Sequence, residues 1–161
     1  MGERVEPGRA LRDGAVAGVV ATATMSVVML TARRLGVMAE QPPRQMTDIV
    51  LDSVRQERSP VWLRNGLAMA SHFAFGAVLG SGFALAHRRY PKPGGLLPRG
   101  VIVASLVWFV SYQGWAPALG LMPPAWRDQP GRPMTMLVAH WVYGATLALC
   151  LGWGEQRVAK R

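Results

Sequence analysis

The sequence predicts an all-α integral membrane protein, a four-helix bundle made of two parallel helix-pair repeats. The first observation is that half of the 161 residues are hydrophobic, although the formal net charge is +9. Such a chain must segregate its charges, and four long segments contain no Asp, Glu, Lys or Arg: residues 14–32, 65–86, 100–126 and 133–154. Each reaches the ~17–25 residues that a membrane-spanning helix requires. We therefore expect a single transmembrane domain over residues 1–161.

The second observation is a phrase that occurs once in each half of the chain. HFAFGAVL begins at His72 and HWVYGATL begins at His140, each inside an uncharged segment. Each half therefore consists of a helix, a loop with a proline pair, and a histidine-bearing helix. A unit with two crossings starts and ends on the same side of the membrane, so the halves are predicted to be parallel repeats about an axis along the membrane normal.

Small residues recur every four positions in three of the predicted spans, which cover residues 14–32, 65–86 and 133–154. Such a spacing places them on one helix face, where they let two backbones approach closely in lipid. The three stripes are Gly14, Gly18, Thr22 and Ser26; then His72, Gly76, Gly80 and Ala84; then His140, Gly144, Ala148 and Gly152. The remaining span, residues 100–121, is expected to be interrupted at Gln113 and Gly114 and kinked or ended by Pro117.

The first loop contains an amphipathic segment at residues 44–57, which predicts a short helix on the membrane surface or capping the bundle. Pro42 and Pro43 are expected to end any helix that precedes it. Asp48 and Asp52 are interpreted as the solvated face of this surface helix.

The basic residues flank the hydrophobic segments, so the bilayer is the predicted partner and nucleic acid is not. Ten of the 18 Lys and Arg residues lie in the N-terminal segment, the second loop and the tail. The positive-inside rule then places both termini in the cytoplasm. The chain has no nucleophile elbow, no phosphate-binding Gly-Lys loop and no paired carboxylates in a span, so we expect no enzymatic activity.

A segment before the fourth span, Ala118-Leu119-Gly120-Leu121-Met122-Pro123-Pro124 with His140-Trp141 after it, resembles the YagU-type family of bacterial inner-membrane proteins. The first half carries similar features, Gln41-Pro42-Pro43-Arg44 and Ser71-His72-Phe73. The resemblance implies a small multi-spanning protein of the bacterial cytoplasmic (inner) membrane. It implies no catalytic residues.

The two histidines lie at matching positions in spans that cross in the same direction, so both imidazoles are predicted to face inward at similar depth. Three interpretations stay open. The rings are packing residues bonded to neighbouring helices through Thr22, Ser26, Ser111 or Gln113; they are a proton-responsive element of a small transporter or channel; or they are the axial ligands of haem b or a related tetrapyrrole.

In the haem interpretation, His72 and His140 ligate the iron, and no other metal is predicted. The remaining candidates are Gly76 and Gly144 for the slot, Phe73, Phe75, Trp141 and Tyr143 for its walls, and Arg44, Arg64 and Arg132 for the propionates. The favoured overall function is a non-enzymatic accessory, assembly or structural subunit of a membrane complex without a cofactor, whose partners would be other membrane-protein subunits.

Overall fold

The computed structural model describes residues 7–38, 41–54, 59–90 and 95–159. Its helices confirm the predicted fold class, and no strand occurs in these ranges. Four helical segments are long and apolar enough to cross a membrane: α1 (Pro7–Arg34), α3 (Val61–Arg89), the segment Leu96–Ala118, and α6 (Arg132–Ala159) as far as Gly154. These segments indicate a membrane protein.

The helices extend beyond the uncharged segments that predicted them. α1 begins seven residues before Gly14, and α6 continues five residues past Gly154. Charged residues mark the edge of the hydrocarbon layer, whereas a helix can continue into the headgroup region with its backbone still internally bonded. Absence of charge therefore located the spans correctly but underestimated the helix lengths.

The third span changes its helical type along its length. It consists of α4 (Leu96–Phe109), a π-helical turn η1 (Val110–Trp115) and α5 (Ala116–Ala118). The predicted interruption at Gln113 and Gly114 is therefore a widened turn, and the helix continues through it. Helix α5 ends one residue after Pro117, as expected from the proline.

The surface helix α2 spans Pro42–Ser53 and starts at the proline pair, where the prediction placed its start after the pair. Proline suits the first helical position because the amide that it lacks has no partner there. The predicted end at residue 57 falls outside the described residues. A short 3₁₀ turn, η2 (Ala125–Arg127), occupies the third loop.

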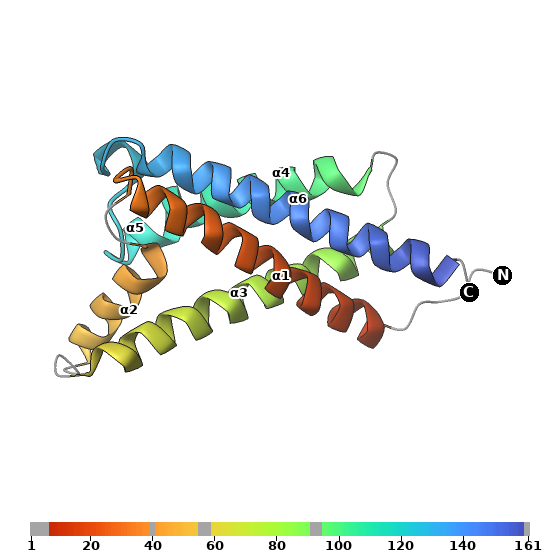
Figure 1. Ribbon diagram of the computed structural model, residues 1–161, viewed down its shortest axis with the longest axis horizontal. Helices are drawn as coiled ribbons and strands as arrows, with labels where there is room; N and C mark the ends of the chain where they lie inside the picture. The colour runs from red at the N-terminus through yellow and green to blue at the C-terminus, as the bar shows by residue number, and fades with distance from the viewer. Residues whose placement is uncertain (1–6, 39–40, 55–58, 91–94, 160–161) are drawn as a thin grey trace.

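The transmembrane helices pack in the order α3, α1, α6, α4. Helix α1 packs along both α3 and α6, and α6 packs along α4, whereas the described parts of α3 and α4 make no comparable contact. Sequence neighbours are therefore spatial neighbours within each half, but not across the second loop. Figure 1 shows that α3 crosses α1 near one end of the bundle and diverges from α4 and α6 toward the other, where α2 lies.

Glycines mark both helix crossings within the halves. A Cβ at Gly18 would collide with the carbonyl oxygen of Gly76, and one at Gly80 with that of Gly14. In the second half, a Cβ at Gly144 would collide with the carbonyl oxygen of Gly100, and the reverse also holds. The predicted stripes therefore form the contact faces, with Gly100 as a partner that the pattern had not singled out.

Candidate ligand-binding site

The space between the diverging helices is a cavity of about 520 Å³. Side chains from α1, α2, α3, α4, η1 and α6 line it, and α2 lies across the end of the bundle where α3 and α6 are far apart. Four methionines contribute to its wall: Met25, Met29, Met46 and Met136. The volume falls in the range of about 300–1,000 Å³ that is typical of small-molecule sites.

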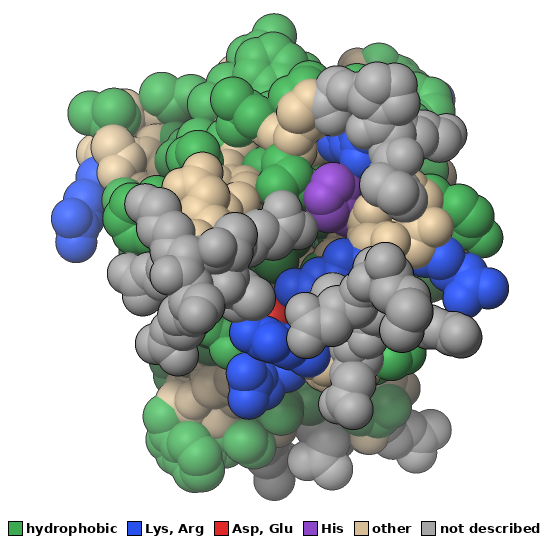
Figure 2. Space-filling view, turned by 90° about the vertical axis from the view of Figure 1, so that its right-hand side faces the viewer, with side chains coloured by type: hydrophobic (Ala, Val, Ile, Leu, Met, Phe, Trp, Pro, Cys, Tyr) green, Lys and Arg blue, Asp and Glu red, His purple; other side chains and the backbone are tan. Residues whose placement is uncertain are grey.

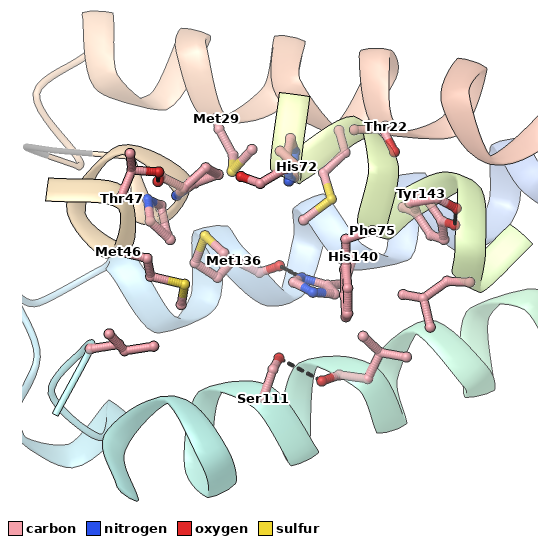
Figure 3. Close-up of a pocket in the computed structure, with 18 of the residues that line it drawn as sticks. Thr22, Met29, Met46, Thr47, His72, Phe75, Ser111, Met136, His140 and Tyr143 are labelled. Carbon is pink, nitrogen blue, oxygen red and sulfur yellow. Dashed lines mark hydrogen bonds between the residues drawn. The ribbon is translucent and has the colours of Figure 1, made fainter. Parts of the chain in front are cut away.

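The cavity offers very little polar chemistry. None of the described residues that line it is Asp, Glu, Lys or Arg. Its Ser and Thr hydroxyl groups donate to carbonyls of their own helical segments: Thr22 to Gly18 at 2.8 Å, Thr47 to Pro43 at 2.8 Å, Ser71 to Ala68 at 3.1 Å, and Ser111 to Val107 at 2.6 Å. The imidazoles of His72 and His140 are the side chains in this cavity whose nitrogens could ligate a metal or form a hydrogen bond with a ligand (Figure 3).

His140 is held by its own helix. Its Nδ1 lies 2.7 Å from the carbonyl oxygen of Met136 (Figure 3). A carbonyl can only accept a hydrogen bond, so Nδ1 carries the proton and Nε2 of the neutral ring keeps its lone pair. The ring can therefore accept a hydrogen bond or ligate a metal through Nε2.

His72 is less well satisfied. Its Nε2 is buried and has no hydrogen-bond partner among the described residues. A buried polar atom without a partner costs free energy, and in native proteins it calls for an explanation such as an absent ligand. Within the described ranges, neither ring makes the expected bond to a hydroxyl or carbonyl group of a neighbouring helix: His140 bonds within α6, and His72 Nε2 has no partner there.

The predicted aromatic wall is formed in part. Phe75 and Tyr143 line the cavity, and the Tyr143 hydroxyl donates to the Gly76 carbonyl at 2.7 Å, which joins α6 to α3 beside it. Phe73 meets the edge of the His72 ring but does not line the cavity, and the indole of Trp141 donates to Ser105 Oγ at 2.9 Å.

The two candidate slot glycines lie in different places. Gly76 lines the cavity, and its missing side chain leaves room for Thr22 of α1. Gly144 lies at the α4–α6 crossing against Gly100, and the described lining does not include it.

The arginines proposed for propionates are engaged by aspartates. Arg64 pairs with Asp48 and Asp52 at 2.9 Å each, and Arg44 pairs with Asp48 at 2.7 Å. The two Arg64 pairs fasten α2 to the start of α3, whereas Arg44 and Asp48 both lie on α2. The interpretation of Asp48 as a fully solvated residue is therefore wrong, because its side chain is only 24% exposed.

A second cluster fastens the third loop. Arg132 pairs with Asp128 at 3.3 Å and donates to Gln45 of α2 at 2.7 Å, and the Tyr112 hydroxyl donates to the same aspartate. The π-helical turn carries Tyr112 and so contributes to this cluster. Sequence reasoning missed both clusters; the signal for them was that Arg and Asp residues occur together in the first and third loops, which lie at one end of the bundle.

The ion pairs lower the pKa of the Asp48 carboxyl group. Burial raises the pKa of Asp48, but the hydrogen bonds and charges of Arg44 and Arg64 outweigh it. The pKa of Asp48 therefore lies below its ordinary value of 3.8.

The opposite end of the bundle is more basic. Figure 2 shows this end, where Arg side chains gather near the centre of the described surface. Asp13 pairs with Arg88 at 3.2 Å, and Arg99 lies 2.9 Å from His87 Nδ1. No group of three or more His, Cys, Asp or Glu side chains suited to a metal ion occurs in the described ranges.

Residues 9–161 match the family described as "Family of unknown function (DUF6789)", and the chain belongs to that family. No curated protein and no solved structure matches the chain.

Proposed function

We propose that this protein binds a neutral, membrane-soluble small molecule within the bundle. One observation carries the proposal: an apolar cavity of about 520 Å³ contains two imidazoles and no Asp, Glu, Lys or Arg among its described lining residues. Largely apolar cavities with a few converging polar groups are the usual form of small-molecule sites. The unpartnered His72 Nε2 is the kind of atom that a ligand would satisfy.

The charge distribution supports a neutral ligand. An anion bound beside His72 or His140 would lack a dedicated cation, because the nearby guanidinium groups of Arg44, Arg64 and Arg132 are all paired with aspartates. Burying an unpaired charge in an apolar site is strongly unfavourable, so a neutral molecule is the better occupant.

The test is to identify what accompanies the protein from its membrane. After mild solubilisation and purification, organic extraction and mass spectrometry should find a hydrophobic compound in a fixed ratio to the wild-type protein. His72→Phe and His140→Phe should reduce that ratio at least about fivefold, because they remove the polar contacts. The exposed Trp153→Phe serves as the control. Equal recovery from all four proteins would reject the site.

Haem is the second candidate, and the geometry of His140 favours it. A backbone carbonyl that accepts from Nδ1 is a common way to orient a metal-ligating histidine. The arginines count against it, because the three that were candidates for the propionates are already paired with aspartates. A Soret band that is lost in His72→Ala and in His140→Ala would establish haem, and a colourless preparation would remove it.

The proposal includes an internal repeat and a membrane location. The repeated phrase and the two glycine crossings support parallel repeats that each supply one histidine to the cavity. The basic end shown in Figure 2, together with the resemblance to the YagU-type family, supports a bacterial inner membrane with both termini in the cytoplasm.

The role of an accessory subunit stays a prediction. Phe109 is 58% exposed on α4 and available to a membrane partner. We expect co-purification with a stable partner after mild solubilisation, and a lone protomer from native membranes would contradict it. This measurement distinguishes a ligand-binding subunit of a complex from a ligand-binding protein that acts alone.

A further inference from the structure

From the proposed ligand site we infer its ligand class and route: a long-chain molecule with a neutral hydroxyl-bearing headgroup enters sideways from the lipid between α3 and α4. The headgroup lies at the two histidines, and the hydrocarbon tail leaves through the gap between these helices. This inference rests on the proposed function and adds the chemistry of the ligand and its source.

The gap is a structural feature of the packing order. In the described ranges, α3 and α4 are the pair of consecutive transmembrane helices that do not pack along each other. An outer groove of about 290 Å³ lies between them and has almost no polar surface. The groove and the cavity share five lining residues, and so the two spaces adjoin each other: Phe75, Leu79, Val107, Ser111 and Trp115.

The groove leads toward lipid. Val103, Leu106 and Val110 line it from α4 and η1 and are 38%, 57% and 58% exposed. In a membrane-spanning segment, exposed side chains of this kind face acyl chains. A hydrocarbon tail is the occupant that suits a narrow, apolar groove that continues into the bilayer.

The loop end of the cavity is obstructed by comparison. Helix α2 lies across it, and α2 is fastened by Arg64 to Asp48 and Asp52 and by Arg132 to Gln45. A ligand from the aqueous phase would have to displace this ion-paired helix. A ligand from the bilayer meets mostly apolar side chains that can change rotamer, and no charged side chain lines the groove among the described residues.

The headgroup chemistry follows from the histidines. Nδ1 of His140 is committed to the Met136 carbonyl, so Nε2 of the neutral ring is an acceptor and requires a donor. A hydroxyl group is a neutral donor that can also accept a hydrogen bond from the unpartnered Nε2 of His72 when that nitrogen carries the proton. Phenols and alcohols have this chemistry, whereas a simple ether or ester has no proton to donate.

The experiment measures binding to the full chain in nanodiscs by calorimetry, with empty nanodiscs as the reference. The probes are 4-dodecylphenol, its methyl ether, and 4-methylphenol. We expect saturable binding of dodecylphenol that is at least about tenfold tighter than that of the ether. The ether is the more apolar probe, so this preference cannot arise from partitioning into lipid. His140→Phe should abolish the preference.

The route is tested with a bulky residue in the gap. Val103 lines the groove but, among the described residues, not the cavity, so Val103→Trp should weaken the binding of dodecylphenol at least about tenfold and leave the binding of methylphenol unchanged. The matched control is Ile102→Trp on the same helix, at a position that is 59% exposed and lines neither space among the described residues.

Each result tests either the route of the ligand or the chemistry of its headgroup. Unchanged dodecylphenol affinity in Val103→Trp overturns the route, and equal binding of phenol and ether overturns the headgroup chemistry. If no probe binds but a histidine-dependent compound of other chemistry co-purifies, the ligand class is wrong and the proposed function stands. If nothing co-purifies and nothing binds, both fail.

Discussion

The two helix pairs, α1 with α3 and α4 with α6, have similar structures but differ in the hydrogen bonding of their histidines. Both pairs cross at glycines, and the first span of each pair, α1 or the segment from α4 to α5, ends in the same motif. Gly36 and Gly120 have φ of 73° and 69°, and the next residue in each case donates its amide to a carbonyl five residues earlier, at 3.0 and 2.9 Å. Such a left-handed glycine closes a helix by satisfying its last carbonyls.

The differences lie in the polar groups. His140 is bonded to Met136 within the second pair, whereas His72 Nε2 of the first pair is buried without a partner among the described residues. Over the same part of the chain, the surface helix α2 belongs to the first pair alone and the π-helical turn to the second pair alone. The shared features hold the fold together, and the differing features surround the cavity. π-helical turns are frequent at functional sites, which agrees with this division.

The largest effect is expected from substitutions at the glycine crossings that both pairs share. Gly80→Leu should destabilise the protein by about 3 kcal/mol or more, because its side chain would meet the backbone of Gly14 and Gly18. Gly144→Leu should do the same in the second pair. Gly82→Leu on α3 is the matched control, because a Cβ added at Gly82 would meet no described atom within 4 Å. Thermal unfolding in detergent measures all three, and a tolerated Gly80→Leu would refute the close crossing.

The next effect concerns the helix that belongs to the first pair. Arg64→Ala removes the arginine that pairs with Asp52 and one of the two that pair with Asp48, and so it should weaken the attachment of α2 to α3. Hydrogen exchange of the α2 amides should rise accordingly. Arg89→Ala, an exposed position at the other end of α3, should leave that exchange unchanged. Equal effects of the two substitutions would show that the ion pairs do not hold α2.

The histidines should respond with opposite signs in protein stripped of ligand. His72→Phe removes a buried nitrogen without a described partner and should raise the free energy of unfolding by about 1 kcal/mol, which raises the unfolding midpoint. His140→Phe removes the bond to Met136 and should lower stability by about 0.5–1 kcal/mol. If both substitutions shift the midpoint in the same direction, the distinction between the two rings is wrong.

The smallest effect is a dependence on acid. The pKa of Asp48 is lower in the folded protein than in the unfolded chain, so its pairing contributes stability above about pH 4. That contribution is lost as the pH falls through the folded pKa. Asp48 remains partly solvated, so we expect less than about 1 kcal/mol. Protection of the α2 amides, which is the intrinsic exchange rate relative to the observed rate at the same pH, should fall below about pH 4 in wild type and in Asp13→Asn. In Asp48→Asn this protection should not change over the same range.

Part of the candidate site was predictable. The inward orientation of His72 and His140 followed from their place on stripes of small residues, and both rings do line one cavity. The role of Gly144 was not predictable, because a glycine that admits a ligand and one that admits a backbone look the same in sequence. The pairing of Arg64 with Asp48 was also hidden, since it depends on how α2 lies against α3.

The sequence by itself determined the four spans, because exclusion of charge from a hydrocarbon layer is a local property of each segment. It also determined the crossing faces, since small residues at four-residue spacing leave a groove on a helix wherever its partner comes from. The tertiary structure alone decided that α3 and α4 stay apart and leave a cavity between them. That choice depends on which helices approach one another across the whole bundle: glycines join α1 to α3 and α4 to α6, and the packing of α1 along α6 joins the two pairs.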